Sequence, residues 1–363
     1  MNPAPIINKK SVKSALPLRQ AQKQEKRLKG KGGRRPLKNY LGKVVTLSPP
    51  KSTLEKSKTA DVPANVSVDE LLCAIEKAGL TGMSGNGFPI HQKITSFLAA
   101  KPGNRILLIN AVECDPALVH DEWLLHNRYA EIRQAIHHLK QTLSLTGVVL
   151  AIKDKRIRPN DACTIATVPP RYPMGEEHFL IRQALGIPIE SDTIPAEQGI
   201  LVLNIQSVYQ IGKIISNDYD GGRFVTIADL TKASARVVYV YPGENIATLL
   251  TAHFGAQGNK TLHKGFGAMS CVTADKMDDF SNCETFAAYV DVPQIDSKNK
   301  CKHCGSCTRR CPMHIKVAKI VQNTDGNRHF DNASYHPERC MQCGSCTYFC
   351  PASKDVSGYV TRG

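Results

Sequence analysis

Aromatic residues and long apolar runs are scarce in this 363-residue sequence. Aromatic side chains make up 6% of it, and there is a single tryptophan, Trp123. No run approaches the ~20 apolar residues that a membrane-spanning helix needs. No apolar stretch follows the first charges, as it would in a secretory signal. We therefore expect a cytoplasmic protein, and contact with the inner face of a membrane stays open only as a peripheral one.

Acidic residues are almost missing from the first 60 positions. This stretch contains sixteen Lys or Arg and two acids, Glu25 and Glu55, whereas the remainder is nearly neutral, with 31 basic and 30 acidic residues. Residues 1–62 are thus predicted to be a basic, largely disordered arm. Docking to an acidic protein partner and contact with an anionic membrane surface both remain open for it. No nucleic-acid partner is expected, because the body shows no recognised nucleic-acid module.

Apolar runs and helical periodicity alternate between residues 63 and 218. Buried strands are expected at 106–109, 148–152, 164–168 and 200–203, and helices at 122–143, 177–185 and 206–215. Strands that alternate with helices predict an α/β domain with a largely parallel sheet.

The pattern changes after residue 218. Segments 224–228 and 236–241 look like a strand pair, and 246–254 looks like a short helix. These features predict a small β-grasp-like (SLBB-type) domain over residues 219–265. The signals then weaken, and a last module is expected over residues 285–363.

Eight of the thirteen cysteines form two tight groups in that last module, each with the spacing C-x2-C-x2-C-x3-C-P. Three cysteines spaced by two residues can wrap one cubane cluster, and in two-cluster ferredoxins the fourth ligates the other cluster. A zinc site is the alternative, but it needs only four ligands. The spacing predicts two [4Fe–4S] clusters and electron transfer. One cluster is assigned to Cys301, Cys304, Cys307 and Cys350, and the other to Cys340, Cys343, Cys346 and Cys311.

A glycine-rich segment at 82–89 precedes the predicted sheet. Such a loop lets backbone N–H groups approach a phosphate or a flat ring, and Lys93 could add positive charge there. Polar residues follow two of the expected strands, at 110–116 and at Asn204. The carboxyl ends of parallel strands are where open α/β sheets bind ligands.

The order of these motifs along residues 66–363 resembles that of a known protein family. The glycine loop is followed by Asn110-Ala-Val-Glu-Cys-Asp-Pro116, by Tyr172-Pro-Met-Gly-Glu-Glu177, and by Pro195-Ala-Glu-Gln-Gly199 with the strand-end Asn204. This order resembles the C subunit of the Rnf electron-transport complex. It is also similar to the cobalamin reductase of propanediol utilisation and to the NADH-binding flavoprotein subunit of complex I. The resemblance implies an FMN/NADH-binding α/β domain, a small β-grasp domain and a helical two-cluster ferredoxin-like module.

The resemblance also implies which residues contact the cofactors. The loop glycines would pack against FMN and the nicotinamide, Lys93 would face the flavin phosphate, and Asp115 would lie toward the NADH ribose. No side chain is expected to act as an acid or base. The implied cofactor-binding residues are Gly82, Gly85, Gly87, Phe88, Lys93, Asn110, Glu113, Asp115, Glu176, Glu177 and Asn204.

The function that follows is NADH oxidation through FMN, with single electrons passed through two [4Fe–4S] clusters to a partner. Ferredoxin, a corrinoid protein or a reductase would fit as that partner. The family loop usually has glycine and alanine where this chain has Ser84 and Asn86, and threonine where it has Ile90. These differences keep open an alternative, a non-catalytic electron-wire or docking subunit of a larger redox complex.

Overall fold

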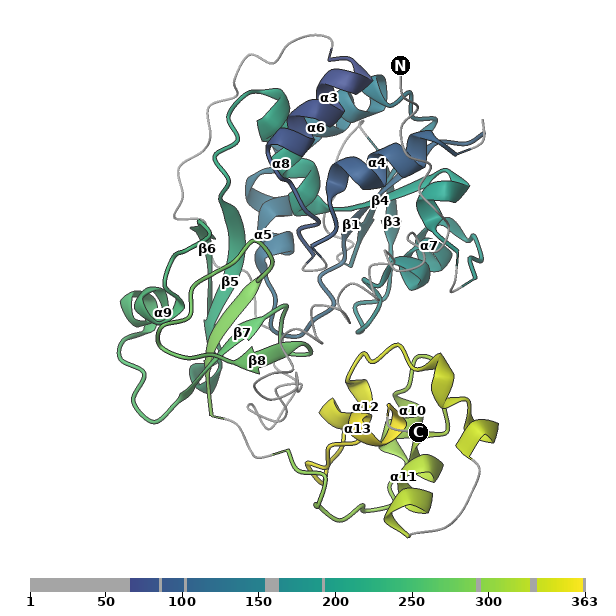
Figure 1. Cartoon of the computed structure of the whole chain (residues 1–363), viewed down its shortest axis with the longest axis vertical. Coiled ribbons are helices and arrows are strands. Elements are labelled where there is room, and N and C mark those ends of the chain that lie inside the picture. The colour runs from purple at the N-terminus through teal and green to yellow at the C-terminus, as the bar shows by residue number, and fades with distance from the viewer. Residues whose placement is uncertain are drawn as a thin grey trace, which may run out of the picture.

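The computed structural model describes residues 66–84, 87–100, 103–153, 163–190, 193–291, 295–326 and 332–361. The predicted basic arm lies outside these residues, as do Gly85 and Asn86 of the glycine loop. Within the described residues, no helix is long and apolar enough to cross a membrane. An α/β domain, a second sheet and a small helical lobe can be distinguished in Figure 1.

The first sheet has four parallel strands, as the alternating pattern predicts, in the order β3-β2-β1-β4. Because β1 pairs in register with β4, Asn110 lies beside Asn204 where the two strands end. The polar residues expected at the carboxyl ends therefore meet at one edge of the sheet. The strands are β1 (Ile106–Ala111), β2 (Gly147–Ile152), β3 (Thr164–Thr167) and β4 (Ile200–Asn204).

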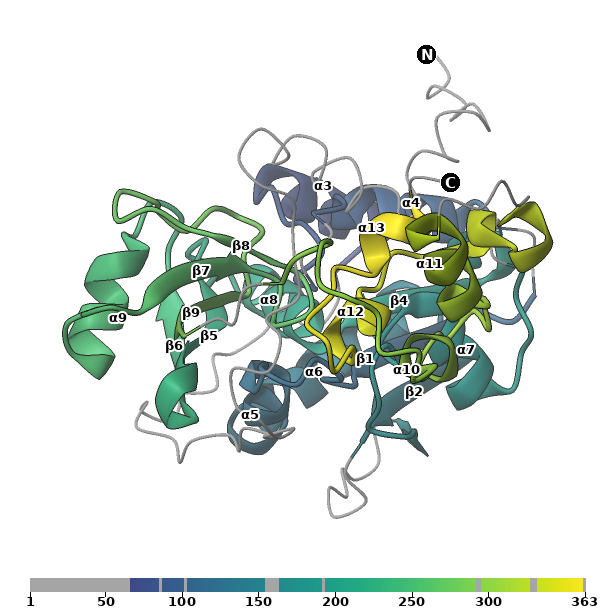
Figure 2. The same cartoon turned by 90° about the horizontal axis from the view of Figure 1, so that it is seen from below.

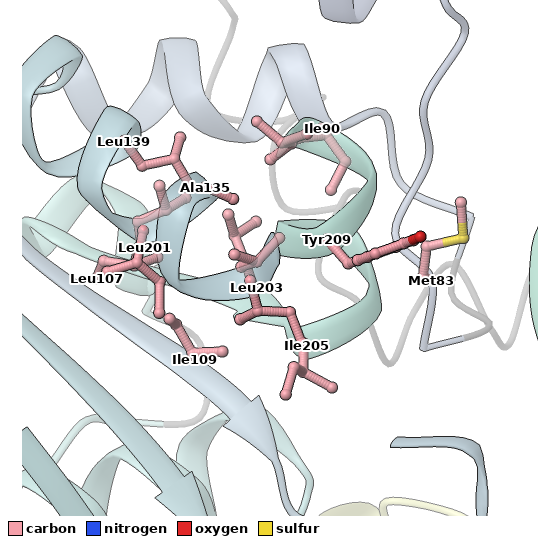
Figure 3. Close-up of a cluster of buried hydrophobic side chains, with 14 of the residues drawn as sticks. Met83, Ile90, Leu107, Ile109, Ala135, Leu139, Leu201, Leu203, Ile205 and Tyr209 are labelled. Atoms are coloured by element: carbon pink, nitrogen blue, oxygen red, sulfur yellow. The ribbon is translucent and has the colours of Figure 1, made fainter. Parts of the chain in front are cut away.

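Different helices cover the two faces of this sheet, because successive side chains of a strand point to opposite sides. Leu107 and Leu201 lie in a core with Leu139 of α6 (Figure 3). Leu108 and Val202 instead pack with residues of α7. The helices are α3 (Val68–Lys77), α4 (Ile90–Leu98), α6 (Tyr129–Thr142), α7 (Glu177–Leu185) and α8 (Ile205–Ile215).

Local sequence signals explain where helix α3 begins, but they do not reveal a break between two later helices. Helix α3 begins at a capping box, in which Ser67 Oγ accepts the N–H of Glu70 and the Glu70 carboxylate accepts the N–H of Ser67. The single helix expected over 122–143 is two helices, α5 (His120–Asn127) and α6. Arg128 between them has φ −132° and ψ 21°, which is outside the helical region. No glycine or proline announces this break.

The second sheet has the order β6-β5-β9-β7-β8. β5 (Arg223–Asp229) runs antiparallel to β6 (Ser234–Val240), and α9 (Ile246–Phe254) packs on the sheet through Ile246 and Leu250. β5 also pairs in parallel with β9 (Phe286–Val290). This arrangement agrees with the β-grasp-like fold that the sequence predicts.

The boundary expected at residue 265 is corrected by this sheet. β8 (Cys271–Thr273), which lies beyond residue 265, pairs with β7 (Thr261–Gly265), and β9 lies between β5 and β7. Residues 285–290, expected to begin the cluster module, thus belong to the second domain. β9 is buried along its whole length and pairs with strands distant in sequence, so no local alternation marked it.

The helical lobe contains the eight grouped cysteines, six of which pack against a small apolar core that includes Ile315, Ile320 and Val356. Figure 2, seen from below, shows the lobe in front of the α/β domain, with α10 over α7. The helices of the lobe are α10 (Ser306–Arg309), α11 (Val317–Asp325), α12 (Ser345–Tyr348) and α13 (Ser357–Val360).

Candidate functional site

The two asparagines at the strand ends are held by the protein itself. Asn110 Nδ2 donates to the carbonyl of Gly175 at 2.9 Å, and its Oδ1 accepts the N–H of Val112 at 2.9 Å. Asn204 caps α8 by accepting the N–H of Gln206 at 2.8 Å, and its Nδ2 donates to Asp121 Oδ2 at 2.7 Å. Both amides therefore fix the backbone that forms the edge of the site.

A buried trio of titratable groups lies at the start of α5. Glu113 accepts the N–H groups of Asp121 and Glu122 at 3.1 and 3.3 Å, and its Oε1 lies 3.5 Å from His120 Nδ1. Burial, together with the charge of Asp121, raises the pKa of Glu113 to about 8, and burial raises that of Asp121 to about 7. Burial lowers the pKa of His120 to about 3, so this imidazole is neutral. Burial thus favours the protonated form of both carboxyls of the trio.

The paired acids of the Tyr172–Glu177 segment have separate tasks. Glu176 caps α7 by accepting the N–H groups of His178 and Phe179. Glu177 is buried, and its Oε1 lies 3.0 Å from Lys93 Nζ. Lys93 therefore faces a carboxylate in this structure, and a cofactor phosphate would share that lysine or replace Glu177 as its partner.

The described part of the glycine loop is held by hydrogen bonds from its backbone N–H groups. The N–H of Gly82 donates to the carbonyl of Phe88 at 2.8 Å, and the N–H of Met83 donates to Ser207 Oγ on α8 at 3.1 Å. Gly87 has φ +63°, a left-handed conformation that favours glycine. Ser84, which replaces a family glycine, is exposed, so its side chain does not fill the protein side of the loop.

Sequence reasoning missed a buried arginine beside this loop. Arg223 is 2% exposed, and its guanidinium donates to the carbonyls of Met83 and Asn282. It comes from β5 of the second domain and ties that domain to the glycine loop. An arginine at the first position of a strand carries no sequence signal that separates this role from a surface position.

Asp115 is placed differently from its expected role. Its carboxylate accepts three backbone N–H groups, from Ala117, Ala268 and Met269, each at 2.9 Å. Gly267 packs directly on it, because a Cβ at that glycine would lie 2.4 Å from the carboxylate carbon. Asp115 borders the cavity described below, but its oxygens are engaged in joining the two domains rather than free to face a ribose.

A cavity of about 1030 Å³ lies between the α/β domain and the cluster lobe. Its walls include Glu113, Asp115 and Lys153 on one side and Arg310 and Cys311 on the other. Lys153 Nζ pairs with Glu122 at 3.0 Å and donates to the carbonyl of Glu113 at 3.1 Å.

Tyr172, on the wall of the cavity, connects the two sides electrostatically. Its pKa is raised well above the usual value by burial and then by the charges of Cys343 and Cys114. One thiol of the second cysteine group therefore acts electrostatically on the segment that follows β3.

The cysteine groups fit two clusters. His303 and Gln342 have φ +53° and +56°, and each donates its N–H at 3.4 Å to the sulfur two residues before it, on Cys301 and Cys340. The two loops thus repeat one conformation, with N–H groups aimed at sulfur, which favours thiolate ligands. All eight cysteines have free thiols.

The electrostatic neighbours of the thiols group them across the two motifs. The pKa of Cys307 is raised by burial and by the thiolates of Cys301 and Cys350. The pKa of Cys340 is raised by burial and by the thiolates of Cys343 and Cys311. Cys350 thus acts electrostatically on Cys307, and Cys311 on Cys340, which is compatible with the cross-ligation that the spacing predicts.

Polar atoms around the sheet edge suit a flavin. Asp121 Oδ1 and Arg223 Nε are two of several buried polar atoms in the described residues that have no hydrogen-bond partner. Gly175 packs closely against the end of β1, because a Cβ there would lie 2.9 Å from the carbonyl oxygen of Val112. A ligand with donors and acceptors along a flat ring could satisfy these atoms.

Comparison with protein families supports both parts of this arrangement. Residues 75–213 match the Nuo51 FMN-binding domain, and residues 300–354 match the 4Fe-4S dicluster domain. The chain joins an FMN-binding domain of the complex I type to a [4Fe–4S] dicluster domain. FMN and two [4Fe–4S] clusters are the cofactors of these domains, as the sequence predicts.

Relatives and solved structures agree with the resemblance. The C subunit of the ion-translocating oxidoreductase complex of Vibrio cholerae serotype O1 is 27% identical over 263 residues, which is 68% of this chain and 34% of that protein. Cobalamin reductase PduS of Salmonella typhimurium is 25% identical over 277 residues, which is 70% of this chain and 60% of that protein. An NAD+-reducing [NiFe]-hydrogenase in the H2-reduced state shares the fold, with a TM-score of 0.56 and 17% sequence identity. The match covers 77% of this chain and 59% of the hydrogenase chain. The chain spans about a third of the length of the Vibrio relative.

Proposed function

We propose that this chain oxidises NADH through FMN and passes single electrons through two [4Fe–4S] clusters to a partner protein. The observation that carries the proposal is the cavity in which Glu113 and Asp115 of the FMN-type domain face Cys311 of the cluster lobe. A bound flavin supplies the conversion from paired to single electrons, while the protein supplies placement and electrostatics.

The proposed cofactor contacts fall into two groups. Gly82, Gly85, Gly87 and Phe88 would line the flavin and nicotinamide, with Lys93 as the cation for the phosphate. Glu113, Glu176 and Glu177 would set the charge around the ring. Because Asn110, Asn204 and Asp115 already bind protein groups, we assign them to holding the walls of the site.

The cluster ligated by Cys311, Cys340, Cys343 and Cys346 would be the first to receive electrons. Cys311 lines the shared cavity, and Cys343 acts electrostatically on Tyr172. The cluster ligated by Cys301, Cys304, Cys307 and Cys350 would pass electrons on. Cross-ligation would keep the two clusters close together.

Anaerobic addition of NADH to the FMN-loaded protein tests the proposal. Bleaching of the flavin absorbance is expected. Lys93→Met should weaken FMN binding roughly ten- to a hundredfold, since a hydrogen bond to a charged group is worth about 1.5–3 kcal/mol. Lys77→Met, at an exposed lysine on α3, is the matched control and should leave FMN affinity unchanged. Equal affinities in both variants would remove Lys93 from the proposed site.

A second candidate is an electron-wire subunit without a working flavin site. The serine and asparagine at 84 and 86 of the glycine loop favour it. Clusters that form normally in a protein that takes up no flavin and does not respond to NADH would select this alternative.

The partner and compartment follow from the same proposal. Thiolate-ligated clusters belong in reducing compartments, which favours the cytoplasm. The relatives named above include a subunit of an ion-translocating oxidoreductase complex. We propose that this chain also works within a larger electron-transfer complex, on the inner face of the membrane if that complex is membrane-bound.

A further inference from the structure

The segment 298–319 of the cluster lobe contains basic residues and no acidic ones. All seven of its Lys and Arg side chains are exposed in the structure. Three of them, Lys298, Lys300 and Lys302, alternate along the chain immediately before and within the first cysteine loop. The seven are Lys298, Lys300, Lys302, Arg309, Arg310, Lys316 and Lys319.

Of these seven, Lys298 and Lys300 line a surface hollow of about 700 Å³, whereas Arg309 and Arg310 line the cavity shared with the α/β domain. His303 and the ligand Cys301 line the hollow as well, and all its lining residues belong to the lobe. The neighbouring ligand Cys304 is exposed. The hollow is therefore distinct from the cavity shared with the α/β domain, where Cys311 lies.

Acidic groups at the rim do not neutralise this charge. Asp325, which lines the hollow, lies 3.2 Å from Lys354 Nζ and accepts from the Tyr359 hydroxyl. Asp296 accepts the backbone N–H of Lys298, so its carboxylate caps a turn. The described part of the lobe, 295–326 and 332–361, has nine Lys or Arg and four Asp or Glu.

We propose that this basic hollow is the docking surface for an acidic one-electron carrier protein. Positive charge around the most exposed cluster ligand would steer such a carrier and hold it close to the cluster of Cys301, Cys304 and Cys307. One electron would leave the reduced cluster and enter the oxidised carrier, with no bond formed or broken. The direction of that transfer rests on the function proposed above, but the docking surface itself does not.

Binding to an acidic flavodoxin, used as the probe, tests the surface without NADH. The oxidised, cluster-loaded full chain is titrated with oxidised flavodoxin by calorimetry at low ionic strength. The variant Lys298→Glu/Lys300→Glu/Lys302→Glu should bind at least about tenfold more weakly, given the usual size of surface charge pairs. Affinity of the parent should fall with added salt, and that dependence should be flatter in the variant.

Two further variants of this chain serve as controls for the triple variant. The neutral variant Lys298→Gln/Lys300→Gln/Lys302→Gln should show an intermediate loss, and visible absorbance checks that both variants keep their clusters. Lys276→Glu changes an exposed lysine of the second domain and should bind as the parent does. A fall in affinity for Lys276→Glu equal to that of the triple variant would overturn the proposal, because the effect would then be one of overall charge.

Kinetics separate this surface from the flavin site. After reduction by dithionite, oxidation of the clusters by flavodoxin should slow in the triple variant, whereas oxidation by basic cytochrome c should not. Failure of NADH to reduce the protein would leave these results untouched. Unchanged flavodoxin affinity in the triple variant would overturn the proposal. The proposal would also be overturned if the triple variant lost binding to anionic lipid vesicles but kept its affinity for flavodoxin, since the surface would then be a membrane-binding surface.

Discussion

Replacing Asp115 by alanine should loosen the junction of the two domains rather than only weaken NADH binding. The carboxylate accepts N–H groups from Ala117, Ala268 and Met269, two of them on the turn between β7 and β8. Without it, three buried donors lose their acceptor, at about 1–3 kcal/mol each before relaxation. A loss of roughly 3–6 kcal/mol is large against a total stability of about 5–15 kcal/mol.

Asp115→Asn separates hydrogen bonding from packing. Its remaining oxygen can still accept from Ala117 and Ala268, which both donate to Oδ1, while the new amide would point a donor at the N–H of Met269. Its cost should therefore be about 1–3 kcal/mol, which places its stability between those of the parent and Asp115→Ala. Asp275→Ala, at an exposed aspartate of the same domain as Ala268, is the matched control and should change nothing measurable.

Hydrogen exchange at the amides of Ala268 and Met269 gives the local readout, with urea unfolding as the global one. Exchange there should accelerate at least about tenfold in Asp115→Ala, since about 1.4 kcal/mol corresponds to a factor of ten. Unchanged exchange and unfolding with a raised KM for NADH would contradict this structural role and return Asp115 to contact with the ribose.

Other predictions concern the buried acid pair and the clusters. Because the pKa of Glu113 is raised to about 8, the folded protein holds that proton more tightly than the unfolded chain, so stability falls as pH rises from about 4.5 toward 8. Glu113→Gln should remove the share of that fall due to Glu113 and leave the share due to Asp121, whose pKa is raised to about 7. Urea midpoints of variant and parent should therefore differ most near pH 8 and converge below about pH 4.5, whereas a constant difference at every pH would contradict the assignment. Cys311→Ala should disturb the cluster held by Cys340, Cys343 and Cys346 and leave the other intact, whereas Cys350→Ala should do the reverse. Electron paramagnetic resonance of each reduced variant checks this, and loss of the same cluster in both would rule out cross-ligation.

Much of the fold could be predicted because its signals are local. Helix α7 agrees with the predicted range, since the acidic cap Glu176 and the left-handed Gly186 mark its ends. The cysteine motifs could likewise be recognised from their spacing alone, and their two loops repeat one backbone conformation. The parallel sheet followed from apolar runs separated by helical periodicity.

The rest depends on contacts between segments that are distant in sequence. β9 could not be recognised, because its place between β5 and β7 follows from pairing alone. Arg223 and Asp115 show the same limit in the site. The first becomes a buried link to the glycine loop, and the second a link between domains, only once the two domains pack together.

Electron transfer from a flavin to two clusters requires that one chain retain all three groups at once. Anaerobic reconstitution with iron, sulfide and FMN, followed by counting of bound iron and flavin in the same sample, measures this directly. We expect about eight irons and about one FMN per chain. About four irons, or about eight irons with no flavin retained, would contradict the proposed function.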